Sequence, residues 1–200
     1  MEKHTLQERS AIPLELTWNL DFLYKNTDEW EADFKKIDGL LGKVQSFKGR
    51  LAESPSVLRD ALKTEDELGL ILERIYVYAH LKADEDTGNS QNRMRLDRIS
   101  SKHAEIEGET AWFEPEMLSM PQEKFGEMMN APELSFYKRS LEETERERKH
   151  TLSEKEERIL GMSSDVLSSP YKTFTLLSNA DLKFPAITDE KGTSVELTHG

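Results

Sequence analysis

The 200-residue chain contains no cysteine. This absence excludes a disulfide scaffold, a thiol nucleophile and a cysteine-based zinc site. It also fits a reducing cytosol, and residues 1–16 contain no apolar segment of signal-peptide length. From these two absences we expect a cytoplasmic protein.

Long apolar runs and clusters of positive charge are missing as well. No segment approaches the roughly 18 apolar residues that span a membrane. Lys and Arg number 27 against 39 Asp and Glu, so the net charge is −12. Nucleic acids and anionic membrane surfaces attract clustered basic residues, and we therefore expect neither as a partner. Such a charge usually serves solubility, although an acidic surface also attracts cationic peptides.

The sequence also lacks the short motifs of known catalytic sites. It contains no Gly-x-Ser-x-Gly elbow, no glycine-rich phosphate loop and no His-Glu-x-x-His segment. His80, His103 and His150 each precede a carboxylate by four residues, but such a pair supplies two ligands where catalytic zinc needs three. We therefore assign no catalytic, cofactor-binding or metal-ligating residue. His103 lies on an apolar helical face and is predicted to be a hydrogen-bonded core residue.

What the sequence does contain is helical periodicity. Charged residues make up 33% of the chain, which favours long amphipathic helices with wide solvated faces. Apolar residues spaced alternately by four and three predict helices over 26–47, from Ser54, over 68–82 and over 90–113. The pattern leaves open whether a break near Thr64 separates the second helix from the third. A short polar connection joins the last two, which should therefore form an antiparallel hairpin.

The second half of the chain predicts shorter helices. Pro121 and Pro132 should each open a short helix. Ser153 and Glu156 have the spacing of a capping box and predict the start of the next helix. A last helix is expected after Pro170.

Two strands should follow, over 182–187 and 194–198, joined by a hairpin loop. A two-stranded ribbon is marginal alone and implies packing against further structure. The first 25 residues read as an irregular leader whose apolar side chains pack against the helices, namely Trp18, Leu20, Phe22, Leu23 and Tyr24. The expected fold class is mainly α: a helical bundle with a long antiparallel helix pair and a C-terminal two-stranded β-ribbon.

Six short segments carry a family resemblance through their order and spacing. They are TWNLDFLY at 17–24, YVYAHLKADED at 76–86, KHTLSEKEE at 149–157, LLSNADLKFP at 176–185, TDEKG at 188–192 and ELTHG at 196–200. Together they resemble oligoendopeptidase F, a member of the thimet-oligopeptidase-like zinc metallopeptidases. The resemblance extends over residues 17–200.

The resemblance implies a parent protein with a catalytic zinc. Full-length members of this family resemble a helical bowl around a deep channel, in which a His-Glu-x-x-His helix and a downstream glutamate hold the metal. The parent would hydrolyse short peptides, and zinc is expected only there. This chain lacks the zinc motif and would form part of the channel wall, inactive alone.

The domain organisation expected on this basis has three parts. Residues 1–25 form the irregular leader, 26–180 the helical N-terminal domain, and 181–200 a β-hairpin that starts a truncated catalytic region ending at Gly200. One face of such a piece should be apolar and exposed. The isolated chain should then self-associate or carry a mobile ribbon.

The sequence leaves two other functions open. A stand-alone helical interaction module built on the long helix pair is the main alternative, and the terminal ribbon speaks against it because an adaptor bundle has little use for an isolated hairpin. An unrelated acid-catalysed enzyme such as a glycosidase has only the abundance of carboxylates in its favour.

Overall fold

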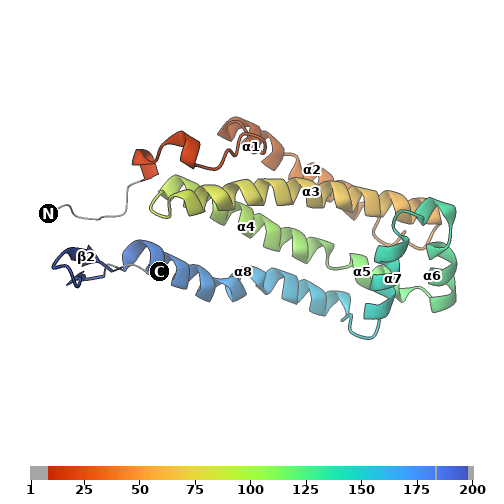
Figure 1. Ribbon diagram of the computed structural model, residues 1–200. Coiled ribbons are helices and arrows are strands. Elements are labelled where there is room, and N and C mark those ends of the chain that lie inside the picture. Colours follow the sequence, from red (N-terminus) through yellow and green to blue (C-terminus); the bar gives the residue numbers. More distant parts are fainter. Residues whose placement is uncertain (1–8, 183, 198–200) are drawn as a thin grey trace.

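Three long helices run side by side, each opposite in direction to its neighbour (Figure 1). The computed structural model describes residues 9–182 and 184–197. Its long helices are α3 (Pro55–Glu85), α4 (Ser90–Thr110) and α8 (Glu154–Leu176). α4 lies between the other two and contacts both of them. The expected antiparallel pair is therefore α3 with α4, and α8 adds a third rod.

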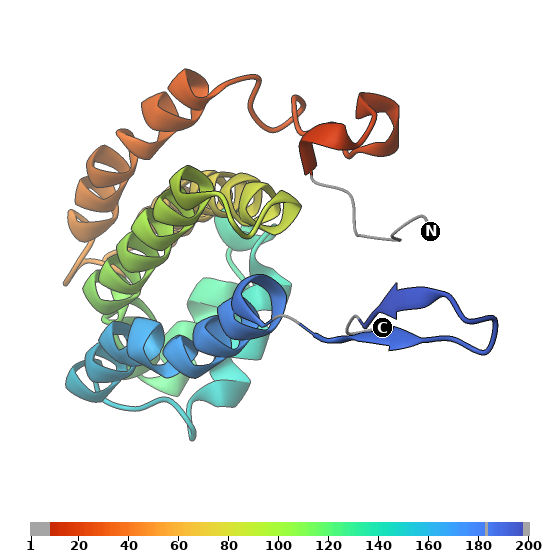
Figure 2. The ribbon, with the colours of Figure 1, turned by 90° about the vertical axis from the view of Figure 1, so that its left-hand side faces the viewer.

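Shorter helices cover one side and one end of these rods (Figures 1 and 2). α1 and α2 pack against α3, and three further helices form the end of the molecule where α4 stops and α8 starts. The bounds of these elements are Thr27–Phe34 for α1, Ile37–Gln45 for α2, Phe113–Ser119 for α5, Gln122–Met129 for α6 and Lys138–Glu147 for α7, with a 3-10 turn, η3, at Pro132–Leu134.

Capping residues fix where the long helices begin. The Ser54 hydroxyl accepts from the backbone N–H of Val57, and Pro55 occupies the first helical position, where no N–H is needed. At the start of α8 the Glu156 carboxylate accepts from the backbone N–H of Ser153, 3.0 Å, and from its hydroxyl, 2.6 Å. The capping box predicted from the sequence is thus confirmed.

The apolar core lies between α1–α2 and α3–α4 and continues into the α5–α7 end. Trp30 is fully buried, and its indole N–H donates to the backbone carbonyl of Ile75 over 3.0 Å. Satisfying that N–H lets the large ring stay in the core without an unpaired donor. The other fully buried large side chains are Phe125, Ile37, Leu51, Leu58, Ile75, Ile99, Leu134, Leu141 and Val44.

Several helix boundaries differ from the sequence prediction. The helix expected over 26–47 is two helices, because the chain turns between Phe34 and Ile37, where the N–H of Lys36 bonds to the carbonyl of Asp33. No break occurs near Thr64, whose hydroxyl bonds to the carbonyl four residues earlier inside a continuous α3. α4 ends at Thr110 rather than at residue 113.

Two prolines lie inside helices of the structure, Pro115 in α5 and Pro170 in α8. Pro115 is in the first turn of α5, where its missing N–H leaves no helical bond unmade. No separate helix follows Pro170, because α8 runs through it. Only one helical bond is lost there, and the turns on either side stay bonded. α8 has 23 residues and is longer than α4 with 21, so the two longest helices are not the pair that was predicted.

The leader and the ribbon also differ from expectation in detail. Leu20 and Tyr24 are buried as predicted, but Trp18 and Phe22 are 84% and 75% exposed, because no described element covers them. The leader includes two 3-10 turns, at Arg9–Ala11 and Leu14–Leu16.

The ribbon consists of two short antiparallel strands, β1 (Ala186–Thr188) and β2 (Ser194–Glu196), with Ile187 opposite Val195. β1 starts after Pro185, which cannot donate to the ladder, and the predicted end of β2 at Thr198 lies outside the described residues. All three residues of β1 are exposed. Figure 2 shows the ribbon extending away from the helices.

Candidate functional site

A groove lies between α3, α4 and α8, with a volume of about 860 Å³. Its walls are the second half of α3, most of α4 and residues 164–176 of α8. Toward the start of α8 the groove closes, because α8 crosses α4 at a pair of glycines. A Cβ on Gly161 would lie 2.9 Å from the backbone carbon of Glu107, and one on Gly108 would lie 2.8 Å from Cγ of Met162. The groove lies beyond this contact, along the first part of α4 and the last part of α8.

Most residues that line the groove are polar or charged by type, although the wall surface itself is largely apolar. Two basic side chains line it, Arg93 and Lys172. The Lys172 ammonium lies 2.7 Å from the carboxylate of Asp165, two turns earlier on α8. The carboxylates outnumber the basic residues and are Glu73, Asp84, Asp97, Glu107 and Asp165. The groove is therefore more negative than positive when its histidines are neutral.

Two of the five histidines line this groove. His80 Nε2 lies 3.5 Å from Asp84, and its ring stacks on Tyr76 with 5.6 Å between centroids. His103 Nδ1 lies 3.2 Å from Glu107. The prediction of a core position for His103 is wrong, since its side chain is 48% exposed. α8 directs small polar residues rather than apolar ones toward this part of α4, so nothing in the described chain seals the histidine from solvent.

The remaining histidine pair predicted from spacing is not formed. His150 is exposed at the connection between α7 and α8, and Glu154 binds Lys48 instead. The three i, i+4 pairs therefore do not come together as one site. Within residues 9–182 and 184–197, no three His, Asp or Glu side chains are arranged to hold a metal ion. The described residues thus do not fit a zinc site.

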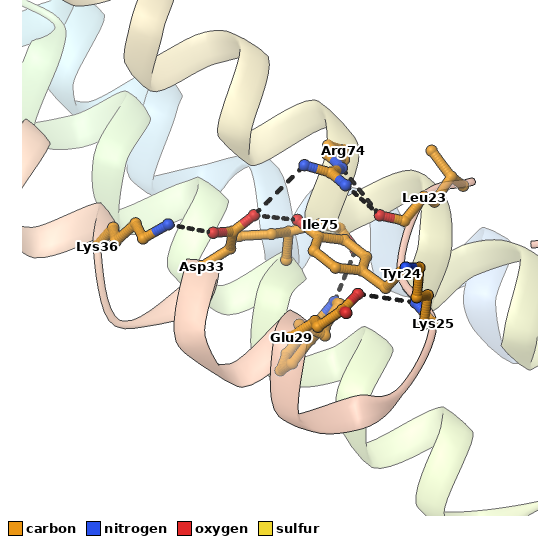
Figure 3. A network of polar contacts seen from close by, with 9 residues as sticks. Leu23, Tyr24, Lys25, Glu29, Asp33, Lys36, Arg74 and Ile75 are labelled. Carbon is orange, nitrogen blue, oxygen red and sulfur yellow. Dashed lines mark hydrogen bonds and ion pairs between the residues drawn. The ribbon is translucent and has the colours of Figure 1, made fainter. Parts of the chain in front are cut away.

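A second polar cluster ties the leader and α1 to α3 (Figure 3). The Tyr24 hydroxyl donates to Asp33 over 2.9 Å, the Lys36 ammonium donates to the same carboxylate over 2.7 Å, and Arg74 lies 3.7 Å from it. Arg74 also donates to the carbonyl of Leu23. Burial raises the pKa of Asp33, but the bonds from Lys36 and Tyr24 and the charges of Lys36 and Arg74 outweigh it and hold the pKa below its usual value.

The same cluster shifts the tyrosine in the opposite direction. Burial, the bond to Asp33 and the charge of that carboxylate raise the pKa of Tyr24. A tyrosine held neutral as a donor to a paired carboxylate has no free acid or base to offer a substrate. We therefore assign this cluster to folding rather than to binding or chemistry.

The side of α8 that faces away from the groove is apolar and exposed. This outer face of α8 consists of Ile159, Leu160, Val166, Leu167 and Phe174, which recur at spacings of seven and eight and so share one side of the helix. They are between 51% and 73% exposed. No residue of α8 is buried. A surface helix normally turns its apolar side inward. α8 does the opposite: its apolar side points away from the other described helices.

Comparison with known proteins assigns the fold and the sequence to one family. A family model described as Oligopeptidase F matches residues 116–184. The chain is 37% identical to Oligopeptidase PepF of Bacillus subtilis over 98% of its own length and 29% of that protein. It is 30% identical to the plasmid Oligoendopeptidase F of Lactococcus lactis subsp. cremoris over 97% of its own length and 33% of the relative. The crystal structure of oligoendopeptidase-F from Enterococcus faecium superposes with a TM-score of 0.81 at 31% identity, covering 87% of this chain and 34% of that one.

The chain belongs to the oligoendopeptidase F family. It is an N-terminal region of such a protein and spans 29% to 33% of the length of these curated relatives. The family resemblance inferred from six short segments is thereby confirmed, as is the mainly α fold class. No helix in the described part of the chain is long and apolar enough to cross a membrane.

Sequence reasoning missed the groove, and it predicted an exposed apolar face without assigning that face to α8. The histidine–carboxylate spacings marked residues of the groove but gave no indication that α3 and α4 present them to the same space. The apolar stripe of α8 was visible in the sequence as Ile159, Leu160 and Val166. An apolar stripe in the sequence does not show whether that side of the helix packs against this chain or is left exposed.

Proposed function

We propose that the chain is the N-terminal, non-catalytic part of a zinc metalloendopeptidase that hydrolyses short peptides. In that protein it forms part of the wall of the substrate channel. The observation that carries this proposal is α8, which turns a polar side to an open groove and leaves an apolar side uncovered. A helix with these two sides fits a position between a water-filled channel and another layer of protein.

The lengths of the relatives support the idea that another layer of protein covers the apolar side of α8. They are oligopeptidases by name, and the chain spans only 29% of the Bacillus subtilis protein and 33% of the plasmid-encoded one from Lactococcus. The remainder of a full-length protein provides the surface that the outer face of α8 requires. That remainder would also provide the zinc ligands, because the 200 residues contain no His-Glu-x-x-His segment.

The chain would serve two roles without taking part in bond cleavage. It would narrow access to the zinc site, so that short peptides enter and folded proteins do not. It would also hold the catalytic part in place through α8. A cytoplasmic location is part of the proposal, and it fits the absence of cysteine from these 200 residues.

The proposal is tested on the isolated 200-residue chain with a fluorogenic peptide and with metal analysis of the purified protein. We expect no hydrolysis and no stoichiometric zinc, because no three suitable ligands meet in the described residues. Stoichiometric zinc, or hydrolysis that a chelator abolishes, would place a catalytic site in this chain and end the proposal.

A further inference from the structure

We propose that the groove between α3, α4 and α8 binds the cationic groups of short peptides, either Lys and Arg side chains or a free amino terminus. The peptide nature of the ligand rests on the proposed function. The preference for positive charge rests on the groove itself.

The groove has the dimensions of a ligand site. Its volume of about 860 Å³ falls in the range of roughly 300–1,000 Å³ typical of small-molecule and cofactor pockets. Tyr76 on α3 and Tyr171 on α8 contribute aromatic rings from two different walls, and Met94 adds an apolar side chain from α4. Aromatic faces attract ammonium and guanidinium groups, and apolar walls hold the methylene stems of Lys and Arg.

The charge of the groove is not balanced within the described chain. Glu73 and Asp97 line it and make no ion pair or side-chain hydrogen bond with any residue of 9–182 or 184–197. Among the described residues of the groove wall, Arg93 is the only cation left to oppose them, because Lys172 is already paired with Asp165. A cleft with excess negative charge concentrates cationic ligands, since low-dielectric walls focus its field.

Two polar atoms of the groove residues also lack partners. One carboxylate oxygen of Glu107 lies 3.2 Å from His103 Nδ1, while its other oxygen, Oε2, is buried without a donor in the described part of the chain. Nδ1 of His80 is also buried and has no hydrogen-bond partner among the described residues. A buried acceptor without a donor costs about 1–3 kcal/mol, and more when it is charged. Turning the Glu107 carboxylate toward an incoming ammonium group would satisfy it.

The experiment measures binding of fluorescein-labelled peptides to the 200-residue chain by fluorescence polarisation. Three peptides of one length are compared, with two Lys, two Glu or two Gln at the same positions and both ends blocked. We expect the Lys peptide to bind and to weaken as salt is raised, and the Glu peptide not to bind. Equal binding of the three peptides would overturn the inference.

A double variant locates the binding in the groove. Glu73→Gln with Asp97→Asn should weaken the Lys peptide by about tenfold, because both uncompensated charges are removed. The matched control is Glu127→Gln with Glu142→Gln, two exposed carboxylates outside the groove that change the net charge by the same amount. Equal weakening by both double variants would show that the overall charge of the chain attracts the peptide, and would refute the groove.

Competition with spermine distinguishes a peptide site from a polyamine site. We expect an unlabelled Lys peptide to displace the labelled one at a lower concentration than spermine does, because the peptide backbone also offers N–H and C=O groups to polar wall residues such as Ser164 and Ser168, and spermine has none. Competition by spermine as effective as that of the Lys peptide would mean that the groove takes a polyamine, and would overturn the peptide assignment.

Failure of the groove inference can be told apart from failure of the proposed function, because peptide binding is measured separately from hydrolysis and zinc content. A chain that binds no peptide and contains no zinc contradicts the groove inference alone. A chain that binds the Lys peptide and cleaves it with its own zinc contradicts the proposed function alone.

Discussion

At the scale of single residues, the core combines burial with the pairing of its polar groups. Ile75 combines both features: its side chain is fully buried, and its carbonyl accepts from the indole of Trp30. The cluster around Asp33 combines burial with pairing of a charged group, because Lys36 and Tyr24 donate hydrogen bonds to a carboxylate that is only 12% exposed. Substitutions at these positions should therefore lower the free energy of unfolding of the whole domain.

The first prediction concerns Ile75. Replacing Ile75 by Asp buries a charge without a partner and should lower the free energy of unfolding by several kcal/mol, on the order of 3–5. Leu70→Asp is the matched control on the same helix, since Leu70 is 69% exposed and should tolerate the change. Thermal melts of both variants measure the difference. A melt of Ile75→Asp that equals the control would refute the core assignment.

The second prediction concerns pH. The folded pKa of Asp33 is below its ordinary value of 3.8, so its ion pairs stabilise the fold above that value and lose their contribution as the pH falls through the folded pKa. Asp33→Asn should therefore be less stable than the parent chain at pH 7, by about 1 kcal/mol or more, and the difference should be smaller at pH 3, below the ordinary pKa of 3.8.

Urea denaturation at the two pH values measures this effect. Asp21→Asn is the control and should show no such convergence, because Asp21 is exposed and its carboxylate makes no ion pair or hydrogen bond within the described residues. A stability difference for Asp33→Asn that is the same at both pH values would contradict the role given to its charge.

At the scale of elements, the contact between α4 and α8 depends on glycine. Gly161 lies against the backbone of Glu107 and Gly108, so a methyl group there meets backbone atoms that cannot turn aside. No apolar side chain of α8 is buried to compensate for a looser fit. The position of α8, and with it the width of the groove, is therefore set by this close approach.

Gly161→Ala should accordingly push α8 away from α4. We expect faster hydrogen exchange along α8 and a lower melting temperature, although Ala normally favours a helix over Gly by about 1 kcal/mol. Gly126→Ala is the matched control, because nothing lies within 4 Å of a Cβ at that position in α6. Stabilisation by both substitutions would mean that the glycine contact does not hold α8.

The elements also divide into those that local sequence predicts and those that it does not. Ser54 with Pro55, and Ser153 with Glu156, were recognised because a cap acts within four residues of itself. The Asp33 cluster and the glycine crossing depend on residues far apart in the chain, such as Arg74 with Leu23. No local pattern contains that information, and the same holds for the exposure of His103.

At the scale of the whole molecule, the chain has a well-formed core on one side and an uncovered apolar face on the other. The core joins α1–α7, whereas α8 and the ribbon after it add little buried surface. The isolated chain should therefore self-associate through the outer face of α8 in spite of its net charge of −12. Sedimentation velocity over a range of concentrations measures this directly.

One pair of substitutions assigns the association to that face. Leu167→Glu, at a residue that is 71% exposed, should leave folding intact and return the chain to a monomer. Ser169→Glu adds the same charge on the same helix, outside the outer face, and should leave association unchanged. Equal behaviour of the two variants would mean that α8 does not mediate the contact.

The central claim, that this chain is a wall of a peptidase whose catalytic part lies elsewhere, is tested most directly by a chimera. The matching region of Oligopeptidase PepF from Bacillus subtilis is replaced by this chain, to which it is 37% identical, and hydrolysis of a short peptide is measured. We predict that the chimera is active, that Leu167→Glu abolishes its activity by breaking the packing of α8, and that Ser169→Glu does not. A chimera that is folded but inactive would contradict the account. So would a chimera whose activity is unchanged by Leu167→Glu.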